Sequence, residues 1–83
     1  MNQQTIYEHR KPQFQRNKAL ILKILTKNPG LTALEIVEQS IRVYGYPFYV
    51  DARLREMRKD KWIRSDLGPD GLLHWTIIPM EEA

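Results

Sequence analysis

Apolar residues in the first third of the chain recur with the period of a helix. Between residues 12 and 28 they fall on one stripe that would face a core: Phe14, Leu20, Ile21, Ile24 and Leu25. Pro12 suits the first turn of this helix, because the amide that proline lacks would be unpaired there. Asn28-Pro29-Gly30 predicts the end of the helix, since proline disfavours a helical residue before it and glycine permits a reversal.

A second helix is predicted from Thr32. Thr32 and Glu35 have the spacing of a capping box, in which each side chain bonds the backbone amide of the other residue. Leu31 and Ile36 have the positions of a hydrophobic staple. We expect Leu34, Val37 and Ile41 to continue the buried side of this helix. The helical pattern fades between residues 40 and 45, and a further short strand near residues 42–44 is an alternative there.

A third helix is predicted from Pro47 to Asp60. Its inward side has helical spacing and consists of Val50, Leu54 and Met57. The positions roughly opposite that side are Phe48, Ala52, Arg55 and Lys59. Arg53 and Arg58 lie on the two flanks between these sides.

Two short apolar strands then flank a tight turn at Gly68-Pro69-Asp70-Gly71. The first strand begins at Trp62, and the returning strand carries alternate apolar residues on one face: Leu73, Trp75 and Ile77. We expect Trp62 and Trp75 to pack in the core and the hairpin. His74 alternates away from Trp75, so we expect it to be exposed and without a role.

Three segments of the chain resemble a known family. The run Arg53-Leu-Arg-Glu-Met-Arg-Lys-Asp-Lys-Trp-Ile63 resembles the stretch from the recognition helix into the first wing strand of winged helix-turn-helix proteins. Gly30-Leu-Thr-Ala-Leu-Glu-Ile36 resembles the start of their second helix, and His74-Trp-Thr-Ile77 resembles their returning wing strand. The chain is similar in particular to the small stand-alone winged-helix proteins of phages and prophages.

The resemblance covers residues 13–78 and implies a mostly α fold with a small β-hairpin, that is, three helices plus a wing. It also implies that the third helix is a recognition helix that enters the DNA major groove. Residues 1–12 are then a flexible basic arm, and residues 79–83 are a frayed acidic tail. The tip of the wing departs from the family, because it contains Asp66 and Asp70 where many members have a cation, and carboxylates repel phosphate.

Charge is distributed unevenly along the 83 residues, whose net charge is +3. Basic residues concentrate in residues 1–30 and 46–64, whereas residues 65–83 contain Asp and Glu but no Lys or Arg. Such asymmetry is typical of a nucleic-acid-facing side, although an ordinary solvated helix surface is also rich in Lys and Arg. Eighty-three residues are enough for one domain.

Several classes of function are excluded by what the sequence lacks. It contains no cysteine, which excludes disulfides and thiolate chemistry, and its two histidines lie far apart, which argues against a structural zinc site. We find no nucleophile with a convergent base and no phosphate-binding glycine loop, so we predict no enzyme, cofactor, metal or small-molecule substrate. No apolar run is long enough to cross a membrane, and we expect a cytoplasmic protein.

The predicted partner is double-stranded DNA. The candidate groove and backbone contacts of the third helix and the residues before it are Tyr46, Tyr49, Ala52, Arg53, Arg55, Arg58 and Lys59. Further phosphate contacts are expected from the arm and the first helix: Arg10, Lys11, Arg16 and Lys18. Homodimerisation is open, since no helix is dedicated to it.

The alternative partner is a protein. Aromatic residues are concentrated between residues 44 and 49, and they are either core, groove contacts or protein-binding anchors. In the core interpretation Tyr44 or Phe48 packs against Trp62. In the protein-binding interpretation the contact surface consists of Tyr44, Phe48, Leu67 and Leu72. The basic third helix favours DNA, and the acidic, apolar wing favours a protein.

Overall fold

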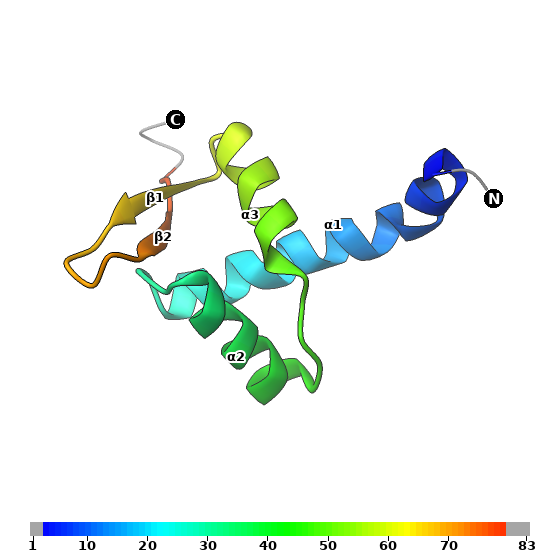
Figure 1. The fold of residues 1–83 in the computed structure, drawn as a ribbon. Helices are drawn as coiled ribbons and strands as arrows, with labels where there is room; N and C mark the ends of the chain where they lie inside the picture. Colours follow the sequence, from blue (N-terminus) through cyan, green and yellow to red (C-terminus); the bar gives the residue numbers. More distant parts are fainter. Residues whose placement is uncertain (1–2, 80–83) are drawn as a thin grey trace.

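The structure is a computed structural model that describes the backbone of residues 3–79 and the side chains of residues 13–79. Three helices are followed by a two-stranded antiparallel hairpin (Figure 1): α1 Gln3–Lys27, α2 Ala33–Tyr44, α3 Val50–Lys59, β1 Ile63–Leu67 and β2 Leu73–Ile77. This order of elements is the predicted one, and the mostly helical class with a small hairpin is confirmed.

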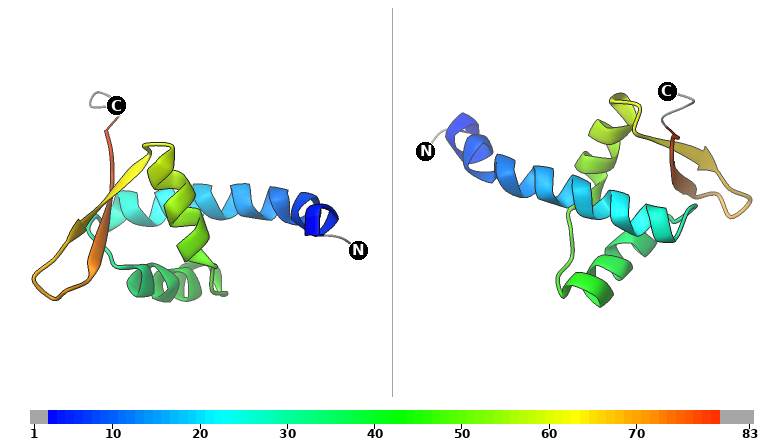
Figure 2. Two further views of the ribbon diagram at one scale, coloured as in Figure 1. Left: turned by 45° about the horizontal axis from the view of Figure 1, so that its top comes forward. Right: turned by 180° about the vertical axis from the view of Figure 1, so that it is seen from behind.

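Helix α1 is longer than predicted, because it begins at Gln3 rather than near Pro12. Residues 3–12, predicted to be a flexible arm, are helical, while residues 1–2 and 80–83 lie outside the described part of the chain. Proline inside a helix removes one backbone hydrogen bond and bends the helix without always ending it. The N-terminal end of α1 extends beyond the other elements (Figure 2), so it needs no apolar stripe and the hydrophobic pattern could not reveal it.

The core lies where the C-terminal half of α1 meets α2, α3 and the hairpin. Its fully buried apolar side chains come from all of these parts: Ile21, Leu25, Ile36, Leu54, Met57 and Ile63. Trp75 of β2 is 6% exposed and belongs to the same cluster, as predicted. Trp62, also expected in the core, is 44% exposed, because it precedes β1 and only the next residue, Ile63, points inward.

The capping box at the start of α2 is confirmed. The amide of Thr32 donates to the Glu35 carboxylate at 3.0 Å, and the amide of Glu35 donates to the Thr32 hydroxyl at 3.3 Å. These two bonds pair amides that have no partner inside the helix, and they fix where α2 begins. The hydrogen bonds with Thr32 also lower the pKa of Glu35 below its ordinary value.

The predicted buried side of α2 is wrong in part. Leu34 is 67% exposed and Ile41 is 50% exposed, whereas Ile36 and Ser40 are fully buried. Ser40 takes a core position because its hydroxyl is satisfied there: it donates to the Val37 carbonyl at 2.6 Å and accepts the Phe48 amide at 3.2 Å. The buried side of α2 therefore includes a polar residue, Ser40, which a pattern of hydrophobic positions does not identify.

Helix α3 begins at Val50 rather than at Pro47. Gly45 ends α2 in the left-handed conformation, with φ of 86°, and the chain reaches Tyr49 without regular structure. Phe48 is held in this connection by its bond to Ser40 and by burial of its ring. The residues before α3 are therefore held against α2 through Phe48.

The hairpin pairs Ile63 with Ile77, Ser65 with Trp75 and Leu67 with Leu73. Its turn is closed by the Gly71 amide, which donates to the Gly68 carbonyl at 3.0 Å, and Gly71 has φ of 80°. The Gly68 amide also donates to the Leu72 carbonyl at 2.8 Å, so Pro69, Asp70 and Gly71 form a three-residue loop of the common type that ends in a left-handed glycine.

A bridge between Leu31 and Trp75 ties the hairpin to the segment before α2. The predicted alternative strand near residues 42–44 is wrong, since these residues are the last turn of α2. None of the helices within residues 3–79 combines the length and the hydrophobicity that crossing a membrane requires.

Candidate nucleic-acid interface

Helix α3 lies across α1 (Figure 1), and basic residues lie on the side of α3 that faces away from the core. Val50, Leu54 and Met57 are buried, as predicted. Arg55 and Lys59 are exposed on the opposite side, and neither has an ion-pair partner among the described residues. The predicted inward side of α3 is thus confirmed, and so is the outward position of Arg55 and Lys59, whereas Ala52 on that side is half-buried.

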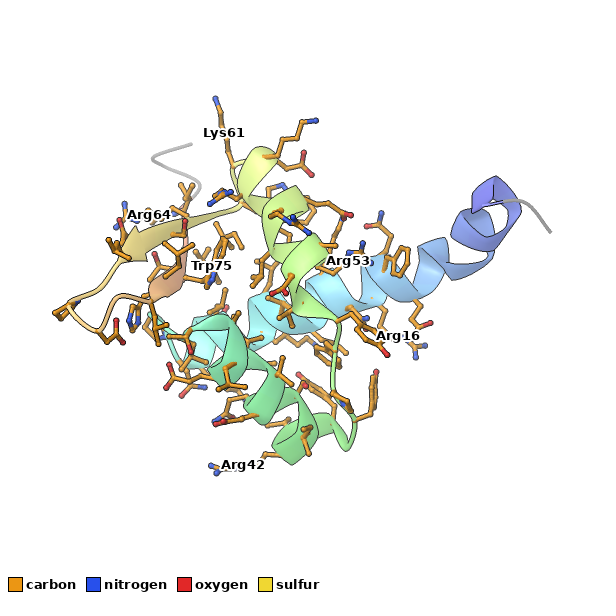
Figure 3. All side chains as sticks on the ribbon, in the orientation of Figure 1. Arg16, Arg42, Arg53, Lys61, Arg64 and Trp75 are labelled. Carbon is orange, nitrogen blue, oxygen red and sulfur yellow. The ribbon has the colours of Figure 1, made fainter. Side chains whose placement is uncertain are left out.

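Arg53 is wrong as a candidate DNA contact. Its side chain points between α3 and α1 (Figure 3), and the residue is 7% exposed. Nη2 lies 2.9 Å from Glu56 Oε1, and the guanidinium carbon lies 3.7 Å from the centre of the Phe14 ring. A cation over an aromatic face is held by the charge distribution of the ring, so Arg53 fastens α3 to α1 and is withdrawn from the surface.

Lys18 is wrong as a phosphate contact for a related reason. Its ammonium group lies 2.8 Å from the other carboxylate oxygen of Glu56, and its side chain is 12% exposed. Glu56 thus bridges the two cations. Burial raises the pKa of Glu56, but the hydrogen bond from Lys18 and the charge of Arg53 outweigh this effect and leave the pKa below its ordinary value. The Glu56 charge is therefore balanced inside the α1–α3 contact.

Arg58 lies on the side of α3 that meets the hairpin. Its Nη1 atom donates to the Ser65 hydroxyl at 3.1 Å, and its guanidinium carbon lies 5.5 Å from the centre of the Trp75 ring. The residue is nevertheless exposed. Arg58 therefore keeps a cation at the surface between α3 and β1, in an orientation limited by two neighbours.

The remaining predicted phosphate contacts are in α1. Arg16 is exposed and projects from the helix (Figure 3). Arg10 and Lys11 belong to the helical residues 3–12, whose side chains lie outside the described part of the structure. The backbone places both residues on the same long helix as Arg16.

The aromatic cluster between residues 44 and 49 is divided. Phe48 is 3% exposed and its ring centre lies 5.7 Å from that of Tyr44 and 5.2 Å from that of Tyr46. Phe48 therefore packs with these tyrosines, and its prediction as a surface contact for a protein is wrong. The prediction that it packs against Trp62 is also wrong, because its described ring partners are Tyr44 and Tyr46. Tyr49, in contrast, is 87% exposed directly before α3.

A shallow cleft separates the start of α2 from the start of α3. Its volume is about 530 Å³, and its walls include Leu34, Val37, Tyr49, Ala52 and Arg55. A smaller cleft of about 240 Å³ lies on the other side of α3, between Arg55 and Trp75. Asp51 lines both clefts. Arg55 and Asp51 therefore lie together on α3 between the two clefts.

The tip of the hairpin has exposed apolar side chains, and each of its carboxylates lies beside a basic side chain. Leu67, Leu72 and Leu73 are 73%, 52% and 44% exposed. Asp66 lies 3.6 Å from Arg64, and Asp70 lies 2.9 Å from His74. Arg64 and His74 are thus the basic neighbours of the two carboxylates at the tip.

His74 is not the exposed residue without a role that the strand alternation predicts. Its Nδ1 atom lies 2.7 Å from the Gly30 carbonyl oxygen, and its Nε2 atom lies 2.9 Å from Asp70 Oδ2. The hydrogen bond with the Gly30 backbone, and then that with Asp70, raise the pKa of His74 above its ordinary value. The residue contacts the α1–α2 turn, which strand alternation does not describe.

Asp51 lies beside Arg55 in both clefts, although the sequence interpretation did not include it among the candidate contacts. It follows the N-terminal residue of α3 and is exposed. The available signal was its spacing from Arg55, because residues four apart lie on the same side of a helix.

Comparison with protein-family models, curated proteins and solved structures found no match to this chain. The functional inference therefore depends on the residues of the candidate interface alone.

Proposed function

We propose that this protein is a winged helix-turn-helix protein that binds duplex DNA, with α3 as the recognition helix and the hairpin as the wing. The observation that carries the proposal is the exposed, basic outer side of α3, where Arg55 and Lys59 have no ion-pair partner within the described residues. Arginine donates two hydrogen bonds to guanine in the major groove, and lysine acts as a point charge toward phosphate.

The balance of charges around α3 supports this proposal. Glu56 is neutralised by Lys18 and Arg53 on the inner flank, so its carboxylate does not oppose the outer cations. Arg58 adds a positive charge next to the hairpin, and exposed Lys61 follows the C-terminal end of α3. Several cations around one helix are what a polyanion requires.

In this proposal each part of the surface has a role. Arg55 and Ala52 face base edges, Lys59 and Arg58 contact the backbone, and Tyr49 packs against sugars or bases at the start of α3. Arg16 on α1 reaches a more distant phosphate. The biological role that fits such a small binding domain is regulation of transcription or of a mobile element, in the cytoplasm.

Fluorescence anisotropy with a labelled random-sequence duplex of about 25 base pairs tests the proposal, because backbone contacts make affinity fall steeply with salt. We expect binding at low salt that weakens at moderate salt, and we expect Arg55→Glu to abolish it. Lys23→Glu is the matched control: it makes the same charge change at a cavity whose described walls come from α1, α2 and the turn after α1. No binding at low salt, or equal loss in both variants, would contradict DNA recognition by α3.

A protein-binding function is the second candidate, and the exposed hairpin leucines favour it. Leu67 and Leu73 are cross-strand partners, and both are exposed. Exposed apolar clusters often mark contact surfaces. In this case Leu67→Ser with Leu72→Ser abolishes the cellular function while Arg55→Glu preserves it; the opposite result favours DNA.

A further inference from the structure

Asp51 is a carboxylate on the basic side of α3. It is exposed, it has no ion-pair partner in the described part of the chain, and it lies one helical turn before Arg55. Both residues line the cleft toward α2 and the cleft toward the hairpin. Asp51 therefore lies beside Arg55 on the surface that a partner of Arg55 would approach.

A carboxylate in this position weakens attraction to phosphate, because the DNA backbone is anionic. It does, however, supply what the rest of the outer side lacks, namely a pure hydrogen-bond acceptor. In the major groove the cytosine N4 amino group is a donor that Asp accepts from, while guanine O6 and N7 accept from Arg.

The spacing of the two side chains suits neighbouring base pairs. Residues separated by four positions are about 6 Å apart along a helix axis. Base pairs are stacked about 3.4 Å apart. A helix in the groove can thus present Asp51 and Arg55 to bases that are no more than about two steps apart.

Resting on the proposed DNA-binding function, we infer that Asp51 is a specificity-determining residue, which accepts a hydrogen bond from a cytosine amino group close to the guanine bound by Arg55. The carboxylate lowers the affinity for unrelated duplexes and favours a site that contains both bases. The substrate is therefore duplex DNA of defined sequence rather than any duplex.

The helix dipole alone also favours an acidic residue in the first turn of α3, and the experiment must separate the two roles. The full chain is used to select duplexes from a random library, and the affinities for the selected duplex and for a shuffled duplex are then measured. Asp51→Ala is compared with Asp60→Ala, which removes an exposed carboxylate at the other end of α3. Circular dichroism confirms that each variant is folded.

We expect the selected site to contain a cytosine within about two base pairs of a guanine, and Asp51→Ala to lower the ratio of selected to shuffled affinity by about tenfold. Asp60→Ala leaves that ratio unchanged. A uniform gain in affinity for both duplexes, or no change, overturns the inference while the DNA-binding function stands. If the wild-type chain binds neither duplex, the proposed function itself is overturned.

Discussion

The imidazole of His74 joins two segments that are far apart in the chain, because it lies 2.7 Å from the Gly30 carbonyl oxygen and 2.9 Å from the Asp70 carboxylate. Both neighbours are hydrogen-bond acceptors. A neutral imidazole has one N–H donor and a protonated imidazole has two, so this geometry fits the protonated ring. The charges of Asp70 and of Glu35 on α2 act in the same direction.

The stability of the fold is therefore expected to depend on pH through His74. Its pKa is raised above the ordinary 6.5 in the folded state, so the stabilisation is fully present below that pH and is lost as the pH rises through the raised pKa. The hydrogen bond with His74 lowers the pKa of Asp70 from 3.8, so the Asp70 contribution is present above that pH and is lost on acidification.

Urea unfolding at about pH 5.5 and about pH 8.5 measures this dependence. We expect the wild-type protein to have a lower free energy of unfolding at the higher pH, and His74→Gln to show a smaller decline. His9 is present in both proteins and cancels in the comparison. An equal decline in both proteins would assign the pH dependence to other groups.

Lys61 follows α3 in a left-handed conformation, with φ of 63°. Its amide donates to the Arg58 carbonyl, and the Trp62 amide donates to the Met57 carbonyl, both at 3.0 Å. This is the Schellman arrangement, in which the left-handed position usually holds glycine. We expect Lys61→Gly to raise the free energy of unfolding by about 1 kcal/mol in urea titrations. Lys61→Ala keeps the Cβ atom, and an equal gain in that variant would show that strain is not the cause.

Ser40 is expected to contribute to stability through the Phe48 amide. Ser40→Ala leaves that buried amide without its acceptor and is expected to cost about 1–3 kcal/mol. Thr26→Ala is the comparison, because the Thr26 hydroxyl makes a similar bond to the Leu22 carbonyl at an exposed site. Chemical denaturation of both variants measures the difference, and similar losses would show that burial of the bond does not matter.

The two neighbouring arginines Arg53 and Arg55 are expected to separate stability from binding. Arg53→Ala removes a buried cation from the α1–α3 contact and is expected to cost about 1–3 kcal/mol of stability. Arg55→Ala is expected to change stability by less than about 0.5 kcal/mol while weakening DNA binding. Unfolding curves and anisotropy titrations of the same two variants provide the measurement, and the reverse assignment would contradict the geometry.

Local signals in the sequence predicted the elements well. The Thr32–Glu35 box defines the start of α2, and the Pro69-Asp70-Gly71 turn defines the hairpin, whereas the end of α2 at Gly45 was left open by the fading pattern. These features succeed because a cap or a tight turn is determined by adjacent residues. The prediction of the start of α1 was wrong, because residues 3–12 have no apolar stripe that would indicate a helix.

The site was harder to predict, because burial depends on the partner element. Spacing places Arg53 and Arg58 on the two flanks of α3. It does not reveal that Arg53 contacts Phe14 and Glu56, or that Arg58 bonds Ser65. Likewise, Leu34 has the spacing of a core residue, but its side chain is 67% exposed. Periodicity thus identifies sides of a helix, and packing decides which of them reaches the surface.

The bridge between Leu31 and Trp75 has a mechanical consequence. The Trp75 amide donates to Leu31 at 2.8 Å, and the Gly30 amide donates to the Trp75 carbonyl at 2.9 Å, so β2 cannot swing outward without breaking both bonds. The position of the hairpin tip relative to the outer side of α3 is therefore fixed before any partner binds. A partner whose shape matches this spacing binds with little loss of conformational freedom in the protein. The hairpin does not move to fit a partner of another shape.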